Sequence, residues 1–201
     1  IDRWKEQGIY DDIKNGTIHI IWTGGEPTIK GHQEAIVNFH KYWMSQDLNV
    51  LSLNNRSLFA TRMLKNPFSR DFFNEIETNG TVYIEENLFN LIDQINCSPK
   101  LANSGMTEKQ RINPEAIKRI MQHDNYQFKF VISTEDDVKE IFRDFVEPFD
   151  IPLKNVCCMP GLDDVANFEE RTQFVLEMAK KYKFRGLTRL HIAAWNKTLN
   201  V

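Results

Sequence analysis

The sequence predicts an α/β protein in which parallel strands alternate with helices. Strand-like and helix-like segments alternate along most of the 201 residues, and this order is typical of parallel sheets with right-handed crossovers. Thr134 precedes three acidic residues, as at a helix start where a side chain caps the first turn and acids oppose the helix dipole. We therefore expect an α/β sheet or barrel.

The expected strands are short runs rich in apolar and β-branched residues. In chain order they are Thr17–Thr23, Leu48–Leu53, Phe72–Thr78, Leu91–Cys97, Tyr126–Ser133, Asn155–Met159 and Thr188–Ile192. The expected helices have apolar residues at helical spacing. They cover a first segment from Ile1 onward, then Gly31–Gln46, Asn113–His123, Thr134–Val146 and Asn167–Tyr182.

One segment, residues 54–70, fits neither pattern. It is polar at both ends and has a short helical centre, so we interpret it as an insertion or an elaborated connection between strands. The chain contains no internal repeat, low-complexity tract or evident linker. We expect residues 1–201 to form one domain, a size that allows a substantial core.

The composition excludes several classes of protein. Hydrophobic residues make up 41% and charged residues 26%, as in ordinary globular proteins. The net charge of -3 argues against a nucleic-acid partner held by phosphate neutralisation. No run is long and apolar enough to cross a membrane, and no secretory signal is visible. The three cysteines favour a reducing compartment, and we expect a cytoplasmic protein.

Glycine, proline and polar residues follow the expected strands. In parallel α/β folds, the carboxyl ends of the strands form the edge where ligands bind. The segments at this edge are Thr23–Pro27, Glu77–Gly80, Ser98–Lys100, Ser133–Thr134 and Met159–Gly161, with His191 and Trp195 near the last strand. Because they come from distant parts of the sequence, they predict a small-molecule site.

Each of these motifs also has an ordinary structural explanation. Gly24 and Gly25 can form a tight turn between strand and helix. Ser98–Lys100 can be a loop with a solvated lysine, and His191 between two apolar residues can be a hydrogen-bonded core histidine. From the residues alone, the inference stops at an α/β protein with a small-molecule site on one rim.

Taken in order, the motifs resemble a known family. Gly24–Pro27 (GGEP) resembles a motif of radical S-adenosylmethionine enzymes. The series ETNGTVY, LID…SPK, KFVISTEDDVKEI and RLHIAAWNKTLNV, at Glu77–Tyr83, Leu91–Lys100, Lys129–Ile141 and Arg189–Val201, resembles the 7-carboxy-7-deazaguanine synthase family. The resemblance extends from about Thr17 to Val201.

The resemblance implies an incomplete β/α barrel of the radical S-adenosylmethionine type. It implies S-adenosylmethionine and a 4Fe–4S cluster as cofactors, with Mg2+ on the substrate carboxylate. The implied substrate is 6-carboxy-5,6,7,8-tetrahydropterin, which loses a hydrogen from carbon-6, contracts its ring and releases ammonia. The product, 7-carboxy-7-deazaguanine, serves queuosine-type 7-deazapurine biosynthesis. The family also implies a flavodoxin-like external electron donor and a homodimer.

The resemblance assigns site residues by position. The implied S-adenosylmethionine contacts are Gly24, Gly25, Glu26, Ser98, Pro99, Lys100, Met159, Pro160, Gly161 and Leu162. The implied substrate contacts are Thr23, His191 and the carboxylate of Val201. Glycines leave the backbone open to the cofactor, and a carboxylate can meet its ammonium group. No residue is assigned as a general base, because radical abstraction is the key step.

Two features depart from the family pattern. The three clustered cysteines that bind the iron–sulfur cluster are absent, and Cys97, Cys157 and Cys158 do not have their spacing. Because the chain starts at Ile1 rather than methionine, we expect the cluster segment and the magnesium ligand to lie upstream. The C-terminus also lacks the family's glycine and Arg-Gly pair. Two other hypotheses remain: another radical enzyme of the activating type, or a non-catalytic ligand-binding protein on a degenerate barrel.

Overall fold

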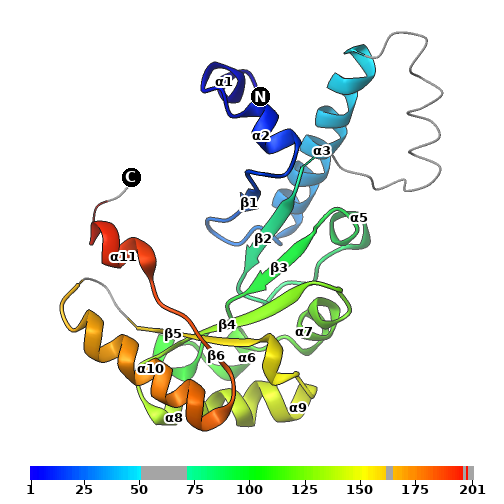
Figure 1. Cartoon of the computed structure of the whole chain (residues 1–201). Helices are drawn as coiled ribbons and strands as arrows, with labels where there is room; N and C mark the ends of the chain where they lie inside the picture. The colour runs from blue at the N-terminus through cyan, green and yellow to red at the C-terminus, as the bar shows by residue number, and fades with distance from the viewer. Residues whose placement is uncertain (51–71, 162–164, 197, 199–201) are drawn as a thin grey trace. The chain divides into compact units, whose positions relative to one another are not determined.

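The predicted α/β class is confirmed in a computed structural model of the chain (Figure 1). The structure describes residues 1–50, 72–161, 165–196 and 198, without the side chains of residues 46–50. Within these residues, six parallel strands with outer helices form a sheet in the order β1-β2-β3-β4-β5-β6. Residue contacts divide the chain into two compact units, unit 1 (Ile1–Glu77 and Ile84–Ile95) and unit 2 (Thr78–Tyr83 and Asn96–Val201).

Unit 1 contains the first strands and the helices that cover them. Its elements are α1 (Asp2–Glu6), α2 (Tyr10–Lys14), β1 (Ile20–Trp22), α3 (Lys30–Val50), β2 (Asn74–Thr78), α5 (Glu86–Phe89) and the start of β3 (Gln94–Cys97). Strands β1 and β2 pair in parallel, with Trp22 opposite Ile76. An aromatic cluster packs α1 and α2 against α3. Trp43 of α3 is 2% exposed and contacts Trp4 of α1 and Tyr10 of α2. These rings pack with aliphatic residues such as Ile13 and Ile20 in one apolar cluster.

Unit 2 contains the remaining strands. Its elements are η2 (Ala102–Ser104), α6 (Glu108–Arg111), α7 (Pro114–Met121), β4 (Tyr126–Ile132), α8 (Glu135–Ile141), the π-helix η3 (Phe142–Val146), α9 (Glu147–Phe149), η4 (Leu153–Asn155), β5 (Val156–Pro160), α10 (Phe168–Tyr182), β6 (Arg185–Gly186) and α11 (Leu190–Trp195). Strand β5 pairs in parallel with β4 and with β6. Helix α10 packs against both β5 and β6 (Figure 1).

Alternation along β4 separates two faces of the sheet in unit 2. Phe128, Phe130 and Ile132 are fully buried, and Phe130 contacts Phe145 of η3 with ring centroids 5.1 Å apart. Lys129, between two of these side chains, is only half-buried. The helices of α8–α9 therefore cover one face, and the other face carries more polar side chains.

The predicted helix start at Thr134 is confirmed. Thr134 Oγ1 accepts a hydrogen bond from Asp137 N, and Asp137 Oδ2 accepts from Thr134 N and Ser133 N at 2.9 and 2.7 Å. This is a capping box in which the third residue is an aspartate. The capping box joins the end of β4 firmly to α8.

Two predicted strands are wrong where the structure describes them. Residues 48–50 continue α3 as a helix, because a short apolar run does not distinguish a strand from a buried helix turn. Within the predicted strand Thr188–Ile192, residues from Leu190 onward begin α11, and the last strand is instead the pair Arg185–Gly186. The alanines that follow Ile192 favour helix over strand.

Two other expectations stay open. The expected insertion, residues 54–70, lies outside the described residues, and a single domain over residues 1–201 remains a prediction. No helix in the described part of the chain has the length and apolar character needed to cross a membrane.

Candidate functional site

The turn after β1 brings two glycines into conformations that other residues rarely adopt. Gly24 has φ +87° and Gly25 has φ +57°, both in the left-handed region that favours glycine. A Cβ atom built on either residue meets nothing within 4 Å, and both residues are exposed. The backbone of the turn is therefore open to close approach by a ligand.

The helix side of this turn is fixed by buried polar contacts. Glu26 Oε1 accepts hydrogen bonds from Thr28 N at 3.0 Å and from Thr28 Oγ1 at 2.5 Å. Gln33 Nε2 donates to the Thr28 carbonyl, and Gln33 Oε1 accepts from Glu85 N at 2.9 Å. Thr28 and Gln33 are 0% and 5% exposed. In this structure the Glu26 carboxylate therefore stabilises the turn by accepting hydrogen bonds from Thr28.

Thr23 lies on the face of the β1–β2 pair that also carries two acidic side chains. Its Oγ1 donates to Glu77 Oε2 at 3.2 Å. Farther along the same face, His19 Nδ1 is 2.6 Å from Glu75 Oε1, and the His19 ring stacks on Phe73 with centroids 4.1 Å apart. This face offers hydroxyl, carboxylate and imidazole groups to a polar ligand.

In unit 2, Ser98–Lys100 follow β3. Ser98 N donates to the Thr78 carbonyl at 2.7 Å, and Ser98 Oγ donates to the Lys129 carbonyl at 3.0 Å. Pro99 is buried, whereas Lys100 is exposed. The serine hydroxyl therefore holds the loop to β4 and leaves the lysine ammonium facing solvent.

Met159–Gly161 lie at the end of β5. Met159 stands opposite Val131 and Pro160 opposite Ile132 in the register with β4. Gly161 N donates to the Ile132 carbonyl at 3.0 Å, and a Cβ on Gly161 would lie 2.5 Å from Ser133 Oγ. A larger residue here would require the Ser133 side chain to move.

The remaining assigned residues are not brought into a described site. His191 is exposed on α11, so the interpretation of a core histidine is wrong. Leu162 and Val201 lie outside the described residues. Unit 1 thus groups Thr23, Gly24, Gly25 and Glu26 in one turn. Unit 2 places Ser98–Lys100 and Met159–Gly161 after β3 and β5, which flank β4.

The cysteines do not fit an iron–sulfur cluster. Cys97, Cys157 and Cys158 are each 0% exposed and form no disulfide with one another, and burial raises the pKa of the Cys157 and Cys158 thiols. Cluster ligands must be thiolates gathered around one centre. No group of three or more histidine, cysteine or acidic side chains able to hold a metal occurs in the described part of the chain. These residues support neither a cluster nor a magnesium site.

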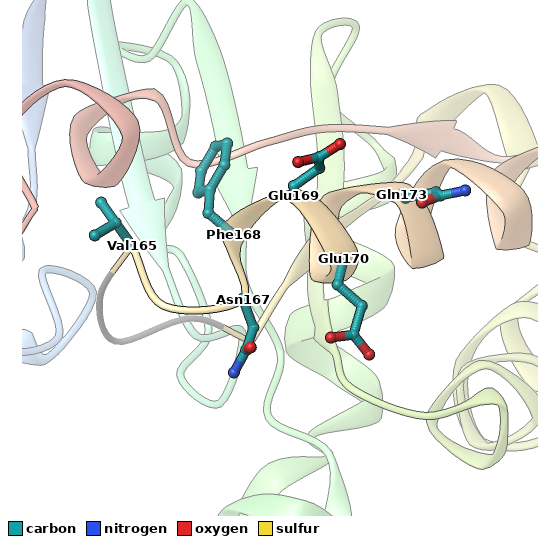
Figure 2. A pocket seen from close by; sticks show the side chains of 6 residues that line it. All are labelled: Val165, Asn167, Phe168, Glu169, Glu170 and Gln173. Atoms are coloured by element: carbon teal, nitrogen blue, oxygen red, sulfur yellow. The ribbon is translucent and has the colours of Figure 1, made fainter.

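A shallow hollow of about 450 Å³ lies at the start of α10, lined by Val165, Asn167, Phe168, Glu169, Glu170 and Gln173. Figure 2 shows that the side chains diverge: Asn167 and Glu170 point to one side, and Phe168 and Glu169 point to the other. Binding sites hold polar groups that converge on the ligand. This hollow lacks that arrangement.

The sequence motifs did not reveal a buried polar group directly before the glycine turn. Trp22 Nε1 donates to Asn74 Oδ1, and Asn74 Nδ2 lies 3.0 Å from His40 Nε2. These residues are separated by 18 to 52 positions in the chain, so no local spacing links them. Asn74 begins β2, a strand that also carries two glutamates and a threonine, so nothing in the sequence distinguishes it as a buried residue.

Comparison with known proteins finds relatives among 7-carboxy-7-deazaguanine synthases, although no family model matches. The synthase of Pyrobaculum aerophilum is 30% identical over 177 residues, which cover 88% of this chain and 65% of that protein. The synthase of Halobacterium salinarum is 25% identical, covering 89% of this chain and 65% of that protein. The crystal structure of QueE from Escherichia coli has a TM-score of 0.51 at 16% identity, covering 94% of this chain and 60% of that one.

These findings establish homology to 7-carboxy-7-deazaguanine synthase over most of the chain. The likeness to the Escherichia coli structure establishes the fold alone, because the identity is low. The chain spans slightly less than two thirds of the length of each relative, at 65%, 65% and 60%.

Proposed function

We propose, from this homology, that the protein is a radical S-adenosylmethionine lyase. Its reaction is conversion of 6-carboxy-5,6,7,8-tetrahydropterin to 7-carboxy-7-deazaguanine with loss of ammonia, in queuosine-type 7-deazapurine biosynthesis. The observation that carries the proposal is 30% identity to a 7-carboxy-7-deazaguanine synthase across 88% of the chain. The protein then takes a pterin substrate, an external electron donor and a second copy of itself as partners.

The open glycine turn supports a cofactor site in unit 1. S-adenosylmethionine would supply the hydrogen-abstracting radical when bound. The exposed backbone of Gly24 and Gly25 can accept its amino group at close range, since no side chain shields either residue. Glu26 adds negative charge beside the turn, which suits a cationic ammonium.

Unit 2 would supply the other cofactor contacts. Lys100 has the charge to meet a carboxylate, and Pro99 and Ser98 hold its loop in place. Met159, Pro160 and Gly161, continuing to Leu162, would pack against the adenosyl part. Thr23, His191 and the carboxylate of Val201 would contact the pterin. The proposal also requires ligands for the 4Fe–4S cluster and for Mg2+ other than the described residues.

The test is anaerobic reconstitution of the protein expressed from its complete reading frame, with iron and sulfide. We expect cluster absorbance, and turnover of carboxytetrahydropterin that depends on S-adenosylmethionine. A protein that carries the cluster but leaves this substrate unchanged would show that the proposed reaction is wrong.

Matched variants test the cofactor site separately. Gly25→Ala places a Cβ where the fold leaves open space, so it should weaken S-adenosylmethionine binding at a folding cost of about 1 kcal/mol. Gly31→Ala is the control, because Gly31 lies six residues on, in the first turn of α3 and also in open space. Lys100→Met should also weaken S-adenosylmethionine binding. Its control is Lys154→Met, because Lys154 is another exposed lysine of unit 2. Equal S-adenosylmethionine affinity in Gly25→Ala and Gly31→Ala would show that the glycine turn is not part of the cofactor site.

A further inference from the structure

Helix α3 carries two buried polar side chains two turns apart on one face. Gln33 and His40 are 5% and 2% exposed, and Ile36 and Trp43 on the same face are also buried. Positions separated by seven residues lie one above the other on a helix. A buried polar side chain is costly unless it is hydrogen-bonded. Both residues contact the segments that flank the glycine turn.

Gln33 holds the helix end of the turn. Its amide nitrogen donates to the Thr28 carbonyl, and its amide oxygen accepts from Glu85 N at 2.9 Å. Thr28 in turn binds the Glu26 carboxylate through both its backbone nitrogen and its hydroxyl. The chain from Glu26 into α3 is therefore anchored to the helix itself.

His40 reaches the strand end of the turn through Asn74. The partners of Asn74 fix the orientation of its amide, because the Trp22 indole N–H can only donate and the Leu91 carbonyl can only accept. Asn74 Oδ1 accepts from Trp22, and Asn74 Nδ2 donates to Leu91 O at 2.6 Å. The second amide hydrogen then faces His40 Nε2 at 3.0 Å.

This orientation decides the protonation of His40. Its Nε2 faces a donor and must accept, so the ring is neutral and carries its proton on Nδ1. The ring is also held flat against Phe72, with centroids 4.9 Å apart. Asn74 is held in place as well, since its backbone N donates to Asp93 Oδ2 and its carbonyl accepts from Asp93 N, both at 2.8 Å.

We propose that His40 is a positioning residue for the glycine turn. As the neutral Nδ1–H tautomer it orients Asn74, which orients Trp22, the residue directly before Thr23 and the two glycines. Helix α3 thereby holds both ends of the turn, with Gln33 at one end and His40 at the other. The inference rests on the proposed function only in taking this turn as the S-adenosylmethionine site.

Substitutions at His40 separate its acceptor from its shape. His40→Gln keeps an acceptor near the position of Nε2. His40→Phe keeps a flat ring against Phe72 but presents no acceptor to Asn74. Tyr42→Phe is the control on the same helix, because Tyr42 is 55% exposed.

The first measurement is nuclear magnetic resonance of the 201-residue chain without cofactors. Long-range 1H–15N couplings in the unaltered protein should show the Nδ1–H tautomer of His40. The amide signals of Gly24 and Gly25 should shift in His40→Phe and return toward their original positions in His40→Gln. An Nε2–H tautomer, or glycine signals that stay in place in His40→Phe, would overturn the proposal.

The second measurement is S-adenosylmethionine affinity of the cluster-loaded, full-length protein. We expect roughly tenfold weaker binding in His40→Phe, by analogy with the lower end of the loss seen when an outer partner of a metal ligand is removed, and recovery in His40→Gln. Equal loss in both variants would contradict the acceptor role. If His40→Phe does not fold, the His40 tautomer in the unaltered protein and the S-adenosylmethionine affinity of His40→Gln still test the proposal. If the unaltered protein binds no S-adenosylmethionine, the proposed function fails while the resonance measurement still tests the positioning of the turn.

Discussion

A buried ion cluster in unit 2 gives a sharp test of the packing of α6 against α8 and η3. Arg111 Nη2 lies 3.0 Å from Glu140 Oε1 and 2.8 Å from Asp144 Oδ2. The Arg111 side chain is 4% exposed, and each acidic side chain is 9% exposed. Among the described residues, Arg111 Nε and Nη1 have no hydrogen-bond partner. The perturbation is Arg111→Met, which keeps an unbranched apolar side chain in place of the arginine stem and removes the guanidinium with its charge.

Two effects oppose each other in this variant. Removing one partner of a buried ion pair costs about 3–5 kcal/mol, because charges remain uncompensated in the interior. Against this, methionine also removes two buried donors that lack partners. Both carboxylates keep other donors. Ala102 N donates to Glu140 at 2.8 Å, and Arg143 donates to Asp144 through Nε at 2.6 Å and Nη2 at 3.1 Å. We therefore expect the lower end, a loss of about 3 kcal/mol, or roughly a hundredfold in the folding equilibrium.

The assay is urea unfolding followed by circular dichroism, with Arg143→Met as the matched control. Arg143 binds the same Asp144, but its side chain is 69% exposed, so we expect a loss of no more than about 1 kcal/mol for the control. Adding Glu140→Gln to Arg111→Met should restore part of the loss, because the amide can still accept from Ala102 N. A loss below about 1 kcal/mol for Arg111→Met, or equal losses for both arginines, would refute the reasoning.

Further predictions concern acid, a close backbone approach and the thiols. The Arg143 guanidinium, aided by Arg111, holds the pKa of Asp144 below its ordinary value, so the stability this carboxylate contributes is present at neutral pH and is lost as pH falls through its folded pKa; acid titration of unfolding should show a smaller slope in Asp144→Asn. Gly80→Ala should be less stable than Gly105→Ala by about 1–3 kcal/mol in thermal unfolding, because both glycines have positive φ but only a Cβ on Gly80 meets an atom, Cys97 Sγ at 2.6 Å. Burial raises the pKa of the Cys158 thiol, so stability should fall as pH rises above the ordinary thiol pKa, by up to about 1.4 kcal/mol per pH unit, and the slope should diminish in Cys158→Ala; an unchanged slope would contradict this.

Long periodic segments allowed most of the fold to be predicted from the sequence. The predicted helix Asn167–Tyr182 is observed as Phe168–Tyr182, and the predicted strand Tyr126–Ser133 as Tyr126–Ile132. The predictions that failed concern short segments. Strand β6 has only two residues, an arginine and a glycine, and it forms because β5 lies beside it rather than through any preference of its own. A strand that forms only because another strand lies beside it cannot be recognised from its own residues.

The candidate site divides in the same way. The glycine turn was predictable, because the left-handed φ of Gly24 and Gly25 is a demand that local residues must meet. The exposure of His191 was not, since neighbouring apolar residues suggested burial and the structure instead begins α11 there. Local chemistry reports on turns and caps, whereas exposure depends on which distant elements pack nearby.

The direction of a hydrogen bond, which group donates and which accepts, is the property hardest to predict from the sequence. Nothing in the order of residues states that His40 accepts, because that follows only when Trp22, Asn74 and the Leu91 carbonyl meet at one point. Once they meet, the inference is strict, since an indole can only donate and a carbonyl can only accept. A single donor-only group at the end of β1 thus determines the charge of a histidine in α3. The same connection makes the turn after β1 sensitive to a residue that does not touch it.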